Sequence, residues 1–166
     1  GITLTLSQET TAPVELTVLN DKEGMRKNIQ AFVDAYNAIN NMLATATKYD
    51  PDTKVAGSLQ GDSTAVGLRN ALRSMMRSET PGGSFSRLLD VGVGFSADGK
   101  MTVDSTKLGT ALDNPAELAR LFGTTNESPT LRGFGLKLKA FADGLVNSGG
   151  TVSTRTDALR SAVTRT

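Results

Sequence analysis

The chain of 166 residues contains no histidine, cysteine or tryptophan, so it lacks the commonest metal ligand and the thiol nucleophile. Catalysis would have to rest on carboxylates, lysines and hydroxyls, and no two carboxylates are spaced to share one helical face in apolar company. Lysine and arginine number 18 and aspartate and glutamate 17, so a net charge of +1 provides no global field for nucleic acid or membranes. We therefore expect an assembly protein rather than an enzyme, without a cofactor.

Neither a membrane-spanning segment nor an N-terminal signal peptide is predicted from the sequence. The sequence has no run of about 20 apolar residues, which predicts no membrane insertion. The start at Gly1 lacks the basic region of a signal peptide and has the pattern of a strand interior. We expect the sequence to be a fragment of a larger protein.

Alternating apolar and polar residues predict a β-hairpin over about residues 1–19. Pairing its strands across a polar loop at 7–12 places six apolar side chains on one face: Ile2, Leu4, Leu6, Val14, Leu16 and Val18. An isolated hairpin is marginally stable in water, so this one is expected to border a sheet formed upstream.

The strongest helix signal runs from Asp21 to about Lys48. Its apolar residues recur at spacings of four and three, as in a heptad seam: Met25, Ile29, Phe32, Tyr36, Ile39 and Leu43. Acids at its start and a lysine at its end suit the helix dipole. Pro51 is expected to stop the helix, because proline disfavours the helical conformation of the residue before it.

A second helix is expected over about 63–78, with Asp62 as its N-cap. Its apolar face comprises Ala65, Leu68, Leu72, Met75 and Met76. Three arginines, Arg69, Arg73 and Arg77, follow one another at four-residue spacing without a neighbouring acid. A solvated face is one interpretation and a contact with a neighbouring subunit is the other, whereas the near-zero net charge argues against phosphate binding.

A second hairpin is predicted within residues 91–103. Pairing Phe95 with Met101 and Val93 with Val103 keeps four apolar residues on one face only if the loop is Ala97-Asp98-Gly99. This register requires a three-residue turn with a left-handed glycine, not a two-residue turn.

Three further helices are expected after this hairpin. Asp104 is a predicted N-cap for a short helix with Leu108 and Leu112, and residues 114–117 resemble a capping box for a helix that ends at Gly123. Ser128-Pro129 is expected to open a longer helix with an apolar seam of Leu131, Phe134, Leu138, Phe141 and Leu145. Its glycines would let a neighbouring backbone approach closely. This seam and that of 25–43 could pack antiparallel, with the 63–78 helix between them.

A thinner seam of Val152, Thr156, Leu159 and Val163 follows Gly149-Gly150 and continues to the end of the chain. It lacks a partner within the sequence, so we expect it to order only against neighbouring subunits. Because their faces look unsatisfied, the candidate contact residues are Arg69, Arg73, Arg77, Val152, Leu159 and Val163.

Two motifs suggest chemistry only weakly. Residues 92–97 fit a loose dinucleotide fingerprint, but a turn and a second strand are predicted after it where that motif needs a helix. Asp50 and Asp52 hint at a calcium loop, yet Val55 and Gly61 stand where a glycine and an acid are required. No catalytic, cofactor or metal residue is therefore predicted.

The sequence LLDVGVGFSADGKMTVDSTKL at 88–108 resembles a signature of the bacterial flagellar filament cap family, also called flagellar hook-associated protein 2 or FliD. Segments in the same order agree with it: 32–37, 49–53, 61–64, 114–123 and 155–157. The resemblance spans nearly the whole chain. Together with this resemblance, the predicted elements indicate an α+β fold, a predominantly helical antiparallel bundle with two β-hairpins.

The resemblance implies that 1–20 end a β-rich head domain, 21–148 form a helical body and 149–166 open a C-terminal coiled-coil leg. It further implies an extracellular subunit, secreted through the flagellar export apparatus, that caps the filament tip and assists flagellin folding and polymerisation. The implied partners are further copies in a ring and flagellin, with an export chaperone left open. An adhesin or receptor-binding module is the alternative, and a flagellin-degrading or nucleotide-dependent enzyme is the rival from another class.

Overall fold

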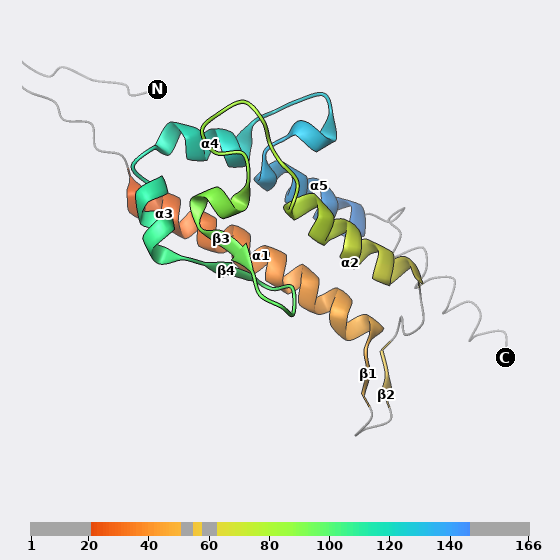
Figure 1. Cartoon of the computed structure of the whole chain (residues 1–166). Coiled ribbons are helices and arrows are strands. Elements are labelled where there is room, and N and C mark those ends of the chain that lie inside the picture. Colours follow the sequence, from red (N-terminus) through yellow and green to blue (C-terminus); the bar gives the residue numbers. More distant parts are fainter. Residues whose placement is uncertain (1–20, 51–54, 58–62, 147–166) are drawn as a thin grey trace, which may run out of the picture.

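A computed structural model describes residues 21–50, 55–57 and 63–146 of the chain (Figure 1). The hairpin expected at 1–19, the N-cap at Asp62 and the seam after Gly150 lie outside these residues. The elements in chain order are α1 (Lys22–Thr47), β1 (Tyr49–Asp50), β2 (Val55–Ala56), α2 (Ser63–Met76), the 3₁₀ helix η1 (Leu88–Val91), β3 (Val93–Phe95), β4 (Met101–Val103), α3 (Ser105–Ala111), α4 (Pro115–Gly123), the 3₁₀ helix η2 (Pro129–Leu131) and α5 (Phe134–Val146).

Helix α1 forms where the heptad seam predicts it. Asp21 is its N-cap and accepts a hydrogen bond from the Gly24 N–H at 2.7 Å, which satisfies one of the free amides of the first turn. The helix ends at Thr47, because Lys48 is already extended. Its buried face comprises Ile29, Val33, Tyr36, Asn40 and Leu43.

Helices α1, α2 and α5 pack side by side, and α2 runs antiparallel to both neighbours (Figure 1). The antiparallel bundle is thus confirmed for adjacent helices. The expectation that α1 and α5 oppose each other is wrong, because both run against α2 and hence in the same direction. No helix in the described ranges is long and apolar enough to cross a membrane.

One hydrophobic core joins the helices to the β3–β4 hairpin. Its fully buried side chains include Tyr36, Leu72, Val93, Leu121 and Phe134. Helix α4 packs on α1 through an edge-to-face contact of Phe32 and Phe122, whose ring centroids lie 5.1 Å apart. Residues from five helices and one hairpin therefore share a single apolar interior.

The β3–β4 hairpin has the predicted register. Val93 pairs with Val103 and Phe95 with Met101, in antiparallel orientation. Gly99 adopts φ 83°, in the left-handed region that the three-residue turn requires. The stretch 92–97 therefore lies on a strand and a turn, not at the start of a helix, and does not have the context of a dinucleotide site.

A short ladder that the sequence analysis did not predict follows α1. Tyr49 pairs with Ala56 and Asp50 with Val55 in a second antiparallel sheet. The turn expected around Pro51 lies partly outside the described residues. A β carbon at Gly57 would come within 2.3 Å of the Ala46 carbonyl oxygen. The backbone that follows β2 therefore packs directly against the end of α1, where only glycine fits.

The two short helices that follow β4 begin differently. Asp104 caps α3 as predicted, accepting hydrogen bonds from Thr106 N and Lys107 N at 3.0 Å. Pro115 opens α4 as predicted, but the capping box is wrong, because the Asn114 side chain makes no capping hydrogen bond. The Glu117 carboxylate instead accepts a hydrogen bond from Ser84 N, in a loop far away in the sequence.

Helix α5 begins at Phe134, so the expectation of one helix from Pro129 is wrong. Residues 129–131 form the separate turn η2, and Arg132 is extended. Gly133 N donates to the Thr124 carbonyl at 2.8 Å, and a β carbon there would lie 2.4 Å from the Phe122 carbonyl carbon. The backbone at Gly133 therefore packs directly on the end of α4, just before α5 begins. This is the close approach of a neighbouring backbone that the glycines of this segment predicted.

Candidate interaction surface

The predicted arginines lie on the α2 helix and the turn after it. Residues 63–78 contain Arg69, Arg73 and Arg77 and no acid, so this element is cationic along its length. Arg69 and Arg73 are half-buried, and Arg77 is exposed. The structure thus places the three arginines along one side of α2 and of the turn that follows it.

Hydrogen bonds from side chains of α1 and α2 attach the tip of the β3–β4 hairpin to these two helices. Arg73 Nη2 donates to the Asp98 carbonyl at 2.8 Å, and the Tyr36 hydroxyl donates to the Gly99 carbonyl at 3.0 Å. Asn37 binds Met101 twice, accepting from its N–H at 2.8 Å and donating to its carbonyl at 3.1 Å. The side chain of Asn37 therefore satisfies both the N–H and the carbonyl group of the first residue of β4.

Aromatic packing continues this attachment along β3. The Arg77 guanidinium lies 5.3 Å from the centroid of the Phe95 ring, and Tyr36 meets the same ring edge-on at 5.8 Å. Burial raises the pKa of the Tyr36 hydroxyl, and the positive charges of Arg73 and Arg77 offset part of that rise. The hydroxyl is thus held as a neutral hydrogen-bond donor.

The candidate contact residues have different positions in this arrangement. Arg73 and Arg77 contact the hairpin of their own chain, while Nε of Arg69 and of Arg73 are buried without an acceptor in the described part. Val152, Leu159 and Val163 lie outside the described residues. Contact of any of the six with a partner stays a prediction.

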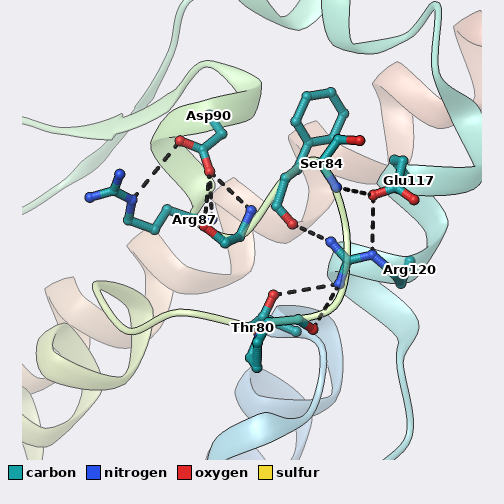
Figure 2. Close-up of polar contacts among 9 residues, drawn as sticks. Thr80, Ser84, Arg87, Asp90, Glu117 and Arg120 are labelled. Atoms are coloured by element: carbon teal, nitrogen blue, oxygen red, sulfur yellow. Dashed lines mark hydrogen bonds and ion pairs between the residues drawn. The ribbon is translucent and has the colours of Figure 1, made fainter.

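A second polar cluster, which we call the loop clamp, holds the segment between α2 and η1 (Figure 2). Arg120 of α4 donates to the carbonyls of Thr80, Pro81 and Phe85, at 3.4 Å to Thr80 and 3.1 Å to Pro81. Its Nε lies 3.2 Å from Glu117 Oε2, and both side chains are mostly buried. One guanidinium therefore satisfies three carbonyls of this loop, and its hydrogen bonds to Thr80 and Phe85 are partly buried.

Two carboxylates complete the loop clamp. Glu117 accepts from Ser84 N at 2.7 Å, and this hydrogen bond holds the pKa of its carboxyl below the ordinary value. Asp90 accepts from Ser86 N at 3.0 Å and Arg87 N at 2.8 Å. Burial pushes the pKa of Asp90 up, but these hydrogen bonds and the Arg87 charge outweigh it and leave a lowered pKa.

The loop clamp was missed by the sequence analysis. Its residues come from positions 80–90 and 117–120, so no local period relates them. The only available signal was an Arg three residues after Glu117 on a short helix, which is the ordinary spacing of a helical ion pair. Proximity of the loop, which only tertiary packing creates, gives this pair its role.

Lys137 is a buried cation outside both clusters. It is 4% exposed, and its Nζ donates to Ser78 Oγ at 2.9 Å and Thr80 Oγ1 at 3.2 Å, while lying 4.6 Å from the Phe134 centroid. Burial lowers the pKa of this amine. Among the described residues, no group of three or more acids is placed to hold a metal ion.

An apolar groove opens on the side of α1 that faces α4. It has a volume of about 310 Å³ and is lined by Met25, Asn28, Ile29, Phe32, Leu118, Ala119, Phe122 and Gly135. Its lining comes from α1, α4 and the first turn of α5. The described part of the chain therefore presents apolar as well as cationic surface to its surroundings.

The fold and these surfaces define a small α+β domain, mostly helical, whose single hairpin in the core is anchored by side chains. The chain belongs to the family described as "Flagellar hook-associated protein 2 C-terminus", whose model matches residues 1–166. The resemblance found in the sequence is thereby confirmed.

Named relatives agree with this membership. The chain is 31% identical over 136 residues to B-type flagellar hook-associated protein 2 of Pseudomonas aeruginosa, covering 79% of this chain and 28% of that protein. It is 29% identical over 170 residues to the A-type protein of the same species, with coverage of 98% and 34%. For flagellar hook-associated protein 2 of Salmonella typhimurium the identity is 26% over 159 residues, with coverage of 89% and 34%. The chain thus spans about a third of the length of these relatives.

A solved structure supports the fold. The D1-D2-D3 domains of the flagellar cap protein FliD from Escherichia coli match with a TM-score of 0.68 at 23% identity, covering 85% of this chain and 37% of that one. The predicted α+β class, with a predominantly helical bundle, is confirmed.

Proposed function

We propose that this chain is part of a structural subunit of the bacterial flagellar filament cap, which caps the filament tip and assists flagellin folding and polymerisation. The observation that carries the proposal is the match of the hook-associated protein 2 family model to residues 1–166. The described helical body, with its anchored hairpin, supports a mechanical rather than a chemical role.

The partners we propose are further copies of the same subunit, arranged in a ring, and flagellin. An export chaperone is a further proposed partner. The proposed location is the extracellular tip of the flagellum, reached through the flagellar export apparatus. Support comes from relatives that are named as flagellar hook-associated proteins.

We also propose the division of labour along the chain: 1–20 ends a head domain, 21–148 is the body and 149–166 begins a leg. The single hydrophobic core, whose buried members run from Ile29 to Leu138, lies within the proposed body and supports treating it as one unit. For contacts with a neighbouring subunit or flagellin we propose Arg69, Arg73 and Arg77 of the body and Val152, Leu159 and Val163 of the leg.

The role is tested in the bacterium that encodes the chain. We expect that deleting the codons for residues 63–146 from the gene abolishes filaments and releases unpolymerised flagellin into the medium. Electron microscopy of cells and immunoblots of the culture supernatant measure both effects, and a plasmid with the intact gene should restore filaments. Filaments of normal length in the deletion strain would contradict the proposal.

The adhesin alternative and the enzyme rival gain no specific support from the described structure. The named relatives are hook-associated proteins, which favours the cap role over both alternatives.

A further inference from the structure

A second groove lies at the end of α2. It has a volume of about 320 Å³ and is lined by Met76, Arg77, Arg87, Leu88, Leu89, Gly94 and Phe95. These residues come from α2 and the turn after it, from η1 with its N-cap, and from β3. We call it the arginine-rimmed groove.

The apolar part of this groove is open because of how η1 and β3 are built. The 3₁₀ helix buries Leu88 and Val91, which leaves Leu89 between them 59% exposed. A β carbon added at Gly94 would stand in ordinary van der Waals contact with Leu89 Cδ1, at 3.8 Å, so the absent side chain leaves room for about one methyl group beside Leu89. An apolar side chain from outside could therefore pack against the exposed face of Leu89.

The rim of the groove has the opposite chemistry. Arg77 lies over Phe95, and no carboxylate of a described residue forms an ion pair with it. Arg87 has two ion pairs at the outer limit of such contacts, 3.9 Å to Glu79 and 4.0 Å to Asp90. Glu79 and Asp90 therefore pair with Arg87, and Arg77 is the guanidinium of the rim that has no ion pair within the described residues.

From this geometry we propose that the arginine-rimmed groove docks an acidic amphipathic helix of a partner protein. A carboxylate of that helix pairs with Arg77, and an apolar residue three or four positions away packs on Leu89 and Gly94. Charge complementarity selects this occupant, because a guanidinium on an aromatic face next to an exposed leucine favours an acid next to an apolar side chain. The proposal stands on the groove and does not depend on the chain being a cap subunit.

The test uses the 166-residue chain and two fluorescein-labelled helical peptides of alanine and leucine, with glutamates or with lysines beside the leucines. Fluorescence anisotropy should show that the glutamate peptide binds and that added salt weakens its binding. Arg77→Gln and Leu89→Ser should each reduce affinity about tenfold. The matched control Lys27→Gln removes an exposed cation of α1 that does not line the groove and should leave affinity within about twofold.

A charge exchange gives the decisive comparison. Arg77→Glu should bind the lysine peptide more tightly than the unmodified chain does, since the ion pair is restored with its sign reversed. Equal binding of the two peptides, no binding up to about 1 mM, or unchanged affinity in Arg77→Gln and Leu89→Ser would overturn the proposal. Sedimentation that shows self-association lost in Leu89→Ser, without peptide binding, would assign the groove to a second copy and overturn it too.

Discussion

Side chains that bind backbone groups hold the loops of this molecule against its helices. Tyr36, Asn37 and Arg73 do so at the hairpin tip, and Arg120 does so in the loop clamp. Each of them joins groups more than 20 residues apart in the sequence, so each holds segments together that no helix or tight turn connects. Such bonds matter most when their loss leaves a partly buried carbonyl without a donor.

Arg120→Ala should lower the free energy of unfolding by about 1–3 kcal/mol, because three loop carbonyls lose their donor and Glu117 loses its ion-pair partner together. Urea denaturation followed by circular dichroism measures the change. Lys139→Ala, which removes an exposed pair with Asp143, is the control and should cost less than about 0.5 kcal/mol. Equal losses in the two variants would show that the loop clamp is not a stabilising unit.

Lys137 predicts a pH dependence of stability at alkaline pH. Its pKa in the folded protein is lowered by burial, whereas the unfolded chain keeps the ordinary value near about 10.4. Between these two values the unfolded state binds more protons, so the free energy of unfolding due to this group rises with pH. In Lys137→Met this rise should be absent, and the exposed Lys139→Met should retain it, in urea titrations at several pH values. A retained rise in Lys137→Met would contradict the assignment.

Among the elements, the β3–β4 hairpin shows sequence and structure in closest agreement. The alternation of apolar and polar residues predicted which side chains share a face of the hairpin. Keeping those side chains on one face then allowed only a three-residue turn, and the observed register agrees. This turn favours glycine at position 99 because the residue there has a positive φ. The Arg73 guanidinium also occupies the space in which a side chain at 99 would lie. Local pattern and tertiary contact therefore require the same residue.

Gly99→Ala should destabilise the protein by about 1–2 kcal/mol, because alanine at positive φ is strained and its methyl group would displace the Arg73 guanidinium. Gly109→Ala in α3 is the matched control. A β carbon there meets nothing within 4 Å, so this change should stabilise by about 0.5–1 kcal/mol. Thermal melts of the two variants should move in opposite directions, and a common direction would contradict the argument.

In the molecule as a whole, the described residues enclose their own core. Side chains from α1, α2, α4, α5 and the hairpin are fully buried together, among them Tyr36, Leu72, Val93, Leu121 and Phe134. Stability of the body should therefore come from residues 21–146.

A fragment of residues 21–146 should consequently fold, with a melting temperature within about 5 °C of the complete chain. Circular dichroism melts of the two proteins at equal concentration make the comparison. A fragment that shows no cooperative transition would place part of the essential core in 1–20 or 147–166.

The sequence by itself determined the elements whose cause is local. The seam of α1, the cap at Asp104, the proline that opens α4 and the register of β3–β4 follow from periodicity and capping within a few residues. The ordered family motifs likewise lie in the primary sequence.

Only the tertiary structure decided the start of α5, the direction of α5 relative to α1, the partner of Glu117 and the position of Arg73 and Arg77 against the hairpin. Each of these depends on which distant segments come together, and helical periods carry no information about the neighbour across the core. Arg120 shows the reason most directly, since its three carbonyl partners lie 35 to 40 residues away.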